Sequence, residues 1–147
     1  MKQTLVIAIL LLPSFRLIAG GGSPTTSNEY VKYQVALKEK SIKPSGRGTL
    51  LIMLQPKHGV HINLKPPITI TFDSTNVVAG AGSPAIPHVD TFLNASKPIK
   101  LPITLSNLLK PGTVAIKGTI TYFFCSDAEG WCSRFKQPFE LAVKVAR

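Results

Sequence analysis

The carboxyl-terminal third of the chain alternates apolar and polar residues with a period of two. Between residues 114 and 124 every second position is apolar or glycine, and most positions between them are polar. A period of two places successive side chains on opposite faces of a β-strand, whereas a helix would repeat every three to four residues. The pattern predicts a strand whose buried face carries Val114, Ile116, Gly118, Ile120, Tyr122 and Phe124.

A second strand, at 132–145, carries the same alternation. Asp127 and Gly130 lie in the short segment between the two strands and suit a hairpin loop. Cys125 and Cys132 are then predicted to face outward as a cross-strand pair within disulfide reach. The expected buried positions of the second strand are Phe139, Leu141, Val143 and Val145, and the outward positions are Cys132, Arg134 and Lys136.

The rest of the chain consists of short apolar runs separated by glycine- and proline-rich turns about every ten residues. Seven short strands with this spacing are typical of an all-β, immunoglobulin-like antiparallel β-sandwich. We expect one such domain over residues 29–147. The predicted strands are 30–37, 49–55, 68–73, 91–93, 99–105, 114–124 and 132–145.

The first residues have the features of a secretory signal peptide, which we assign to residues 1–20. Lys2 is followed by an apolar run at 5–12 and by small residues near Gly20, and Pro13 and Arg16 leave the run too short to span a bilayer. A linker rich in glycine, serine and threonine follows at 21–28. We therefore expect a periplasmic or secreted protein, in a compartment where a disulfide can persist.

The net charge of +10 raises the question of an acidic partner. The lysines and arginines are scattered, with no arginine-rich cluster or interleaved aromatic residues, so we expect no nucleic-acid binding. A loose attraction to an anionic membrane surface or to an acidic protein stays open. His58, His61, His88 and Met53 do not follow the spacing of a copper site, and we expect neither a metal nor a cofactor.

The cysteine pair has two interpretations. A bond across so short a loop would stabilise the fold by about 2.5 kcal/mol in the chain-entropy model, whereas an exposed bond at a hairpin tip can exchange with an attacking thiolate. Exposure favours exchange. Arg134 lies on the predicted face of Cys132 and favours its thiolate, while Asp127 and Glu129 follow Cys125 and disfavour one there. Cys132 is therefore the expected nucleophile.

Three segments carry a family resemblance in the same order along the chain: 59–63 (GVHIN), 101–105 (LPITL) and 118–132 (GTITYFFCSDAEGWC). They resemble the amino-terminal periplasmic domain of the thiol:disulfide interchange protein DsbD. The resemblance implies an immunoglobulin-like sandwich that accepts electrons from a membrane-linked, thioredoxin-like relay and passes them to oxidised proteins. It also implies that Cys132 forms the mixed disulfide and that Cys125 resolves it. The partners would be thioredoxin-fold proteins acting in trans.

The chain departs from the family pattern beside the cysteines. One more residue separates Cys125 from Cys132 than in the typical family loop, and Ser133 to Phe135 replace the prolines that usually follow. The family's acidic and aromatic cap loop corresponds to the shorter segment 87–92, in which Asp90 and Phe92 are the cap candidates. Trp131 is either a packing residue of the hairpin or part of a docking surface.

The sequence thus predicts an exported thiol:disulfide interchange domain with protein-disulfide reductase-like chemistry if the Cys125–Cys132 pair is active. The alternative is a non-enzymatic envelope binding module in which the disulfide is structural. The direction of electron flow and the oligomeric state stay open.

Overall fold

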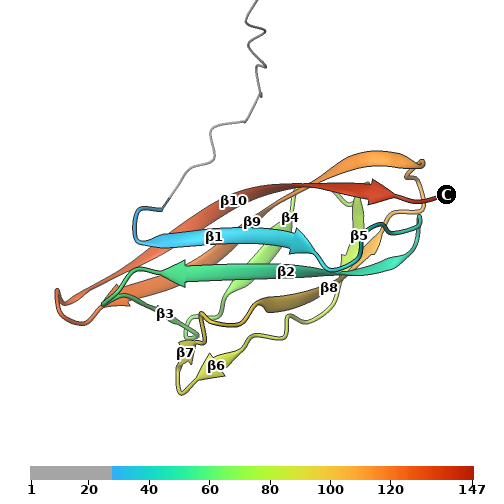
Figure 1. Ribbon diagram of the computed structural model, residues 1–147. Coiled ribbons are helices and arrows are strands. Elements are labelled where there is room, and N and C mark those ends of the chain that lie inside the picture. Colours follow the sequence, from blue (N-terminus) through green and yellow to red (C-terminus); the bar gives the residue numbers. More distant parts are fainter. Residues whose placement is uncertain (1–27) are drawn as a thin grey trace, which may run out of the picture.

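The computed structural model describes residues 28–147, and these form two packed antiparallel β-sheets (Figure 1). The predicted signal peptide and nearly all of the predicted linker lie outside these residues. The strands are β1 (Val31–Leu37), β2 (Arg47–Pro56), β3 (His61–Asn63), β4 (Thr69–Phe72), β5 (Val78–Ala81), β6 (His88–Val89), β7 (Phe92–Leu93), β8 (Ile99–Leu105), β9 (Gly112–Ser126) and β10 (Trp131–Val145).

The order of the strands makes the sandwich immunoglobulin-like, as predicted. One sheet has the order β1-β2-β8-β5, and the other has the order β10-β9-β3-β7-β6, with β4 also paired to β9. In chain order, β1, β2, β5 and β8 take the places of strands A, B, D and E of an immunoglobulin domain. The pair β3 and β4 takes the place of strand C, and β9 and β10 take those of F and G. The β6–β7 hairpin is added at the edge beside β3.

All seven predicted strands are present, and β8 has the predicted bounds. Three strands were not predicted, β3, β5 and β6, and each has four residues or fewer. Such short runs contain too few residues to display a period. Two prolines separate β3 from β4, because Pro66 and Pro67 have no backbone N–H to donate to the ladder with β9.

The core lies between the sheets and follows the predicted alternation. On β9 the predicted inner positions are buried except for Val114, which is half-buried, and on β10 only Leu141 of the four predicted positions is half-buried. Apolar side chains from β2 and β8 face them. The largest contributions come from Leu50, Ile52, Leu54, Ile99, Ile103, Ile116, Ile120 and Tyr122.

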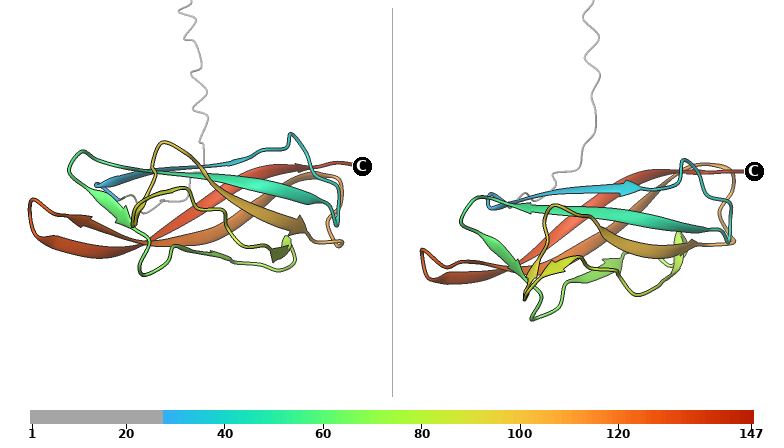
Figure 2. Two further views of the ribbon diagram at one scale, coloured as in Figure 1. Left: turned by 90° about the horizontal axis from the view of Figure 1, so that it is seen from below. Right: turned by 60° about the horizontal axis from the view of Figure 1, so that its bottom comes forward.

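The β9–β10 hairpin runs the length of the molecule. Its two strands are 15 residues each, and they pair continuously from Trp131–Ser126 to Val145–Gly112. The three views show its tip at the end of the sandwich opposite the carboxyl terminus (Figures 1 and 2). The cysteines therefore lie at one end of the molecule.

The buried Tyr122 predicts a loss of stability at alkaline pH. Burial raises its pKa from 10.0 to about 12, and a hydrogen bond donated by Asn28 Nδ2 to the phenol oxygen opposes this shift only in part. Because the neutral phenol is favoured in the folded state, its contribution is fully present below pH 10 and is lost as the pH rises towards 12. We expect the free energy of unfolding of the wild type to fall between pH 9 and pH 12 in chemical unfolding experiments. In Tyr122→Phe this fall should be smaller by about 2 kcal/mol. An identical drop in the two proteins would contradict this.

Candidate functional site

The two cysteines meet across the β9–β10 ladder, as predicted. Cys125 pairs with Cys132 in the register of the hairpin, their Cα atoms are 4.1 Å apart, and the sulfurs form a disulfide. The loop between them is closed by Gly130, whose positive φ of 70° suits glycine and whose N–H donates to the carbonyl of Ser126 at 2.9 Å. A tight turn thus brings the two strands into the register that pairs the cysteines.

The two cysteines differ in exposure, and the expectation of an exposed disulfide holds for Cys132 but not for Cys125. Cys132 is exposed on the edge strand β10, whereas Cys125 is only 4% exposed. Cys125 does lie on the outer face, since the side chain of its neighbour Phe124 points into the core, but its strand β9 runs between β10 and β3. Side chains of β3 therefore cover Cys125. A reagent in solution reaches the disulfide from the side of Cys132.

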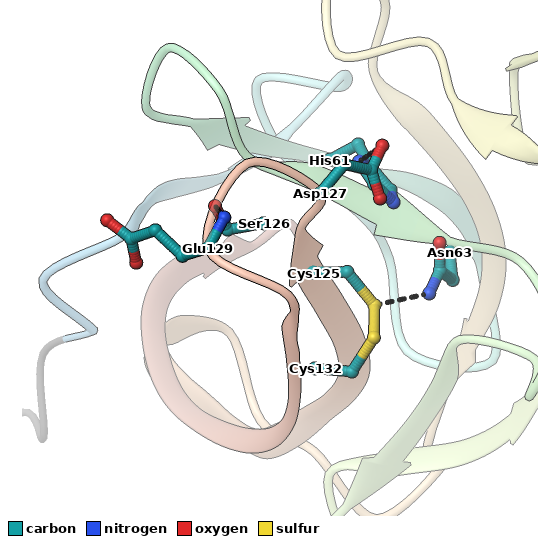
Figure 3. A network of polar contacts seen from close by, with 7 residues as sticks. All are labelled: His61, Asn63, Cys125, Ser126, Asp127, Glu129 and Cys132. Carbon is teal, nitrogen blue, oxygen red and sulfur yellow. Dashed lines mark hydrogen bonds and ion pairs between the residues drawn. A yellow bond between two sulfur atoms is a disulfide. The ribbon is translucent and has the colours of Figure 1, made fainter.

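Asn63 of β3 forms a direct polar contact with the disulfide. Its Nδ2 amide donates a hydrogen bond to Cys125 Sγ at 2.9 Å (Figure 3). Asn63 pairs in register with Phe123, two residues before Cys125, so its side chain points to the same outer face. The bond reaches Cys125 alone, and it therefore distinguishes the two sulfurs electrostatically.

His61 lies directly opposite Cys125 in the register of β3 and β9. Its Nδ1 is 3.5 Å from Asp127 Oδ2, and the ring of Phe92 packs on its imidazole with the ring centroids 4.2 Å apart. Phe92 therefore packs on His61, and His61 in turn lies beside Cys125 on the outer face. Asp90, the other cap candidate, is exposed and has a positive φ of 51° between β6 and β7.

The two carboxylates of the hairpin loop, Asp127 and Glu129, make polar contacts with groups other than the sulfurs. Asp127 is turned towards His61, and Glu129 points away from the disulfide (Figure 3). The Glu129 carboxylate accepts a hydrogen bond from the indole N–H of Trp131. Sequence spacing placed both acids near Cys125, but the structure gives each of them a different neighbour.

Trp131 packs at the base of the hairpin loop. Its ring meets Tyr30 edge-on, with the centroids 4.9 Å apart, and Phe124 at 5.6 Å. Of the two roles considered for this residue, the structure thus places it in packing contacts. Arg134 is exposed two residues beyond Cys132 and shares its strand face, as expected from the period of two.

Sequence reasoning did not identify His61 and Asn63 as residues of this site. The available signal was the run 60–64, in which apolar Val60, Ile62 and Leu64 alternate with the two polar residues between a turn and a pair of prolines. This alternation is what a short strand with one polar face requires. Its partner strand could not be read from the run itself.

From residue 28 onward, the chain has neither a metal-binding cluster nor a membrane-spanning helix. No group of three or more histidine, cysteine, aspartate or glutamate side chains there is arranged to hold a metal ion. The same residues include no helix that is long and apolar enough to cross a membrane.

Comparisons with known proteins give distant structural likenesses only. No family model matches the chain. No curated protein matches it either. Among solved structures, the chain is similar to the crystal structure of the yeast GGA1 GAE domain, with 15% sequence identity and a TM-score of 0.43, over 78% of this chain and 94% of that chain.

Proposed function

We propose that this protein is a thiol:disulfide interchange domain in which the Cys125–Cys132 bond is the reacting group. The observation that carries the proposal is the asymmetry of the pair, since Cys132 is exposed and Cys125 is buried. Exchange requires that an attacking thiolate reach one sulfur in line with the bond. Only Cys132 offers that approach, and Cys125 is sheltered as the sulfur that leaves.

Reduction of the domain then has two steps. A thiolate of a donor dithiol attacks Cys132 Sγ, a bond forms between these two sulfurs, and the electron pair of the broken Cys125–Cys132 bond goes to Cys125 as a thiolate. The second thiolate of the donor attacks the donor sulfur of this mixed disulfide. Cys132 leaves as a thiolate, the donor becomes a disulfide, and two electrons have moved to the domain.

Delivery of the electrons reverses this sequence on a second protein. The Cys132 thiolate attacks the disulfide of the oxidised partner, and one partner sulfur leaves as a thiolate. The Cys125 thiolate then attacks Cys132 Sγ, which restores the intramolecular bond and releases the second partner sulfur. The partner is reduced, and Cys125 acts as the resolving cysteine.

The position of the bond supports exchange over a purely structural role. In immunoglobulin domains the conserved disulfide joins the two sheets through the core, whereas here it joins neighbouring strands of one sheet. The cysteines are 7 residues apart on strands already held by a continuous ladder. The bond therefore constrains the unfolded chain by only about 2.5 kcal/mol in the chain-entropy model.

The partners and location follow from the sequence resemblance to the DsbD amino-terminal domain. The proposal is an exported domain of the cell envelope that exchanges electrons with thioredoxin-fold proteins in trans. The exposed residue Cys132, at the tip end of the β9–β10 hairpin, supports such docking, because a second protein can approach this end of the sandwich.

The reduction potential of the pair tests this function. We expect equilibration with glutathione or dithiothreitol buffers to give a potential above about −300 mV, because structural disulfides lie below that value. The double variant Cys125→Ser/Cys132→Ser should keep its β-sheet circular dichroism and lose no more than about 3 kcal/mol of stability. A potential below that limit, together with a double variant that does not fold, would instead favour an envelope binding module with a structural disulfide.

A further inference from the structure

The hydrogen bond between Asn63 and Cys125 has a consequence for the chemistry of the disulfide. Asn63 Nδ2 donates to Cys125 Sγ at 2.9 Å, and the side chain comes from β3, whose backbone pairs with β9 on one side and with β7 on the other. The donor is therefore held by strands on both sides. The acceptor sulfur belongs to a residue that is only 4% exposed, so water has little access to it.

We propose that Asn63 is a catalytic residue that stabilises the thiolate of Cys125 as the disulfide opens. The proposal rests on the proposed function, in which attack on Cys132 sends the electron pair to Cys125. A buried thiolate without a partner is costly, and a hydrogen bond to a charged acceptor is roughly twice as strong as one to a neutral acceptor. The contact therefore becomes stronger as negative charge develops on the sulfur.

The same contact selects which sulfur leaves. A leaving thiol departs faster when its thiolate is more stable. Asn63 donates its hydrogen bond to Cys125 Sγ, so cleavage that releases Cys125 is favoured over cleavage that releases Cys132. Exposure directs the attack to Cys132, and Asn63 favours the same direction by stabilising the product.

A second consequence concerns the equilibrium between disulfide and dithiol. A donor that stabilises the Cys125 thiolate favours the reduced domain and makes the disulfide more oxidising. The titratable residues His61 and Asp127, and Arg134 on β10, lie on this part of the outer face and stay unchanged in the variants below. Any change in the equilibrium on replacing Asn63 then reports the amide itself.

The first experiment measures Cys125 ionisation by thiolate absorbance near 240 nm across a pH series. The parent is the full chain with Cys132→Ser, which leaves Cys125 as the sole thiol. We expect Asn63→Ala to disfavour the thiolate about tenfold, the scale of a lost charge-assisted hydrogen bond. Asn63→Asp has nearly the same shape, carries no N–H donor and adds a negative charge, so it should disfavour the thiolate further.

The matched control is Asn107→Ala, an exposed amide that follows β8 near the other end of the sandwich. It should leave the thiolate equilibrium within twofold of the parent. If Asn63→Ala does not fold, Asn63→Leu carries the test instead, because it keeps nearly the shape of the side chain, has no N–H donor and adds no charge. Thiolate equilibria within twofold of the parent in the folded Asn63 variants would overturn the proposal.

The second experiment uses the intact cysteine pair. We expect Asn63→Ala to lower the equilibrium constant for reduction by dithiothreitol about tenfold, which corresponds to a potential about 30 mV more negative. An unchanged constant would contradict the role of Asn63. Neither experiment uses a partner protein, so a failure of partner exchange and a failure of the Asn63 proposal are separate results.

Discussion

Replacing Cys125 with serine should convert the protein into a covalent trap for its partners. Cys132 keeps its exposed position on β10 and can still attack or be attacked, but no second thiol remains to resolve the mixed disulfide. If the protein is exported as proposed, extracts of the cell envelope should yield adducts with this variant that disappear on reduction. Under the proposed function these adducts contain thioredoxin-fold proteins, identified by mass spectrometry.

The matched variant Cys132→Ser should yield few adducts or none. Its remaining thiol, Cys125, is buried beside β3 within the sheet and cannot approach a partner sulfur in line. Equal trapping by both variants would show that exposure does not decide which sulfur reacts. Trapping by neither variant, with a wild-type bond that resists glutathione, would remove thiol exchange as the function.

Adding a single methyl group at Gly118 should lower the protein's free energy of unfolding substantially. Gly118 lies on β9 between β4 and β10, and an added Cβ would stand 2.2 Å from the backbone carbonyl oxygen of Thr71 and 2.9 Å from the ring of Phe139. The carbonyl cannot rotate away without breaking the β4–β9 ladder. We expect Gly118→Ala to lose about 3 kcal/mol in urea unfolding, at the upper end for an overpacked core.

The control for this substitution is Gly80→Ala on β5. An added Cβ there meets no atom within 4 Å, and the residue is exposed on an edge strand. Its free energy of unfolding should change by no more than about 0.5 kcal/mol. A Gly118→Ala protein as stable as the Gly80→Ala protein would mean that β4 can move away from β9 at little cost.

The β9–β10 hairpin was predictable because its information is local. A period of two over some thirty residues specifies two strands, their inner faces and the turn between them, and the turn sets the register that pairs Cys125 with Cys132. The bounds of β8 were predictable for the same reason, since its inner positions alternate without interruption. Gln137 was not among the expected buried residues, although the period of two places it on the inner face with Phe139, because polar side chains are seldom fully buried.

The environment of the disulfide could not be predicted from the sequence around the two cysteines. The periodicity of β9 places Cys125 on the outer face but says nothing of what covers that face. The cover comes from β3, with Asn63 lying 62 residues before the cysteine to which it donates. A pairing of that kind depends on the order of strands in the sheet, which short and interrupted strands such as β3 and β4 do not encode in their own pattern.

The sequence by itself determined the class of fold, the hairpin and the pairing of its two cysteines, because alternation and turn residues act between neighbours in the chain. Only the tertiary structure decided that the two sulfurs are unequal. Cys125 is buried and Cys132 is exposed because β9 lies inside its sheet and β10 lies at its edge. That position in the sheet also brings Asn63 to one sulfur alone, and it results from packing distant segments side by side.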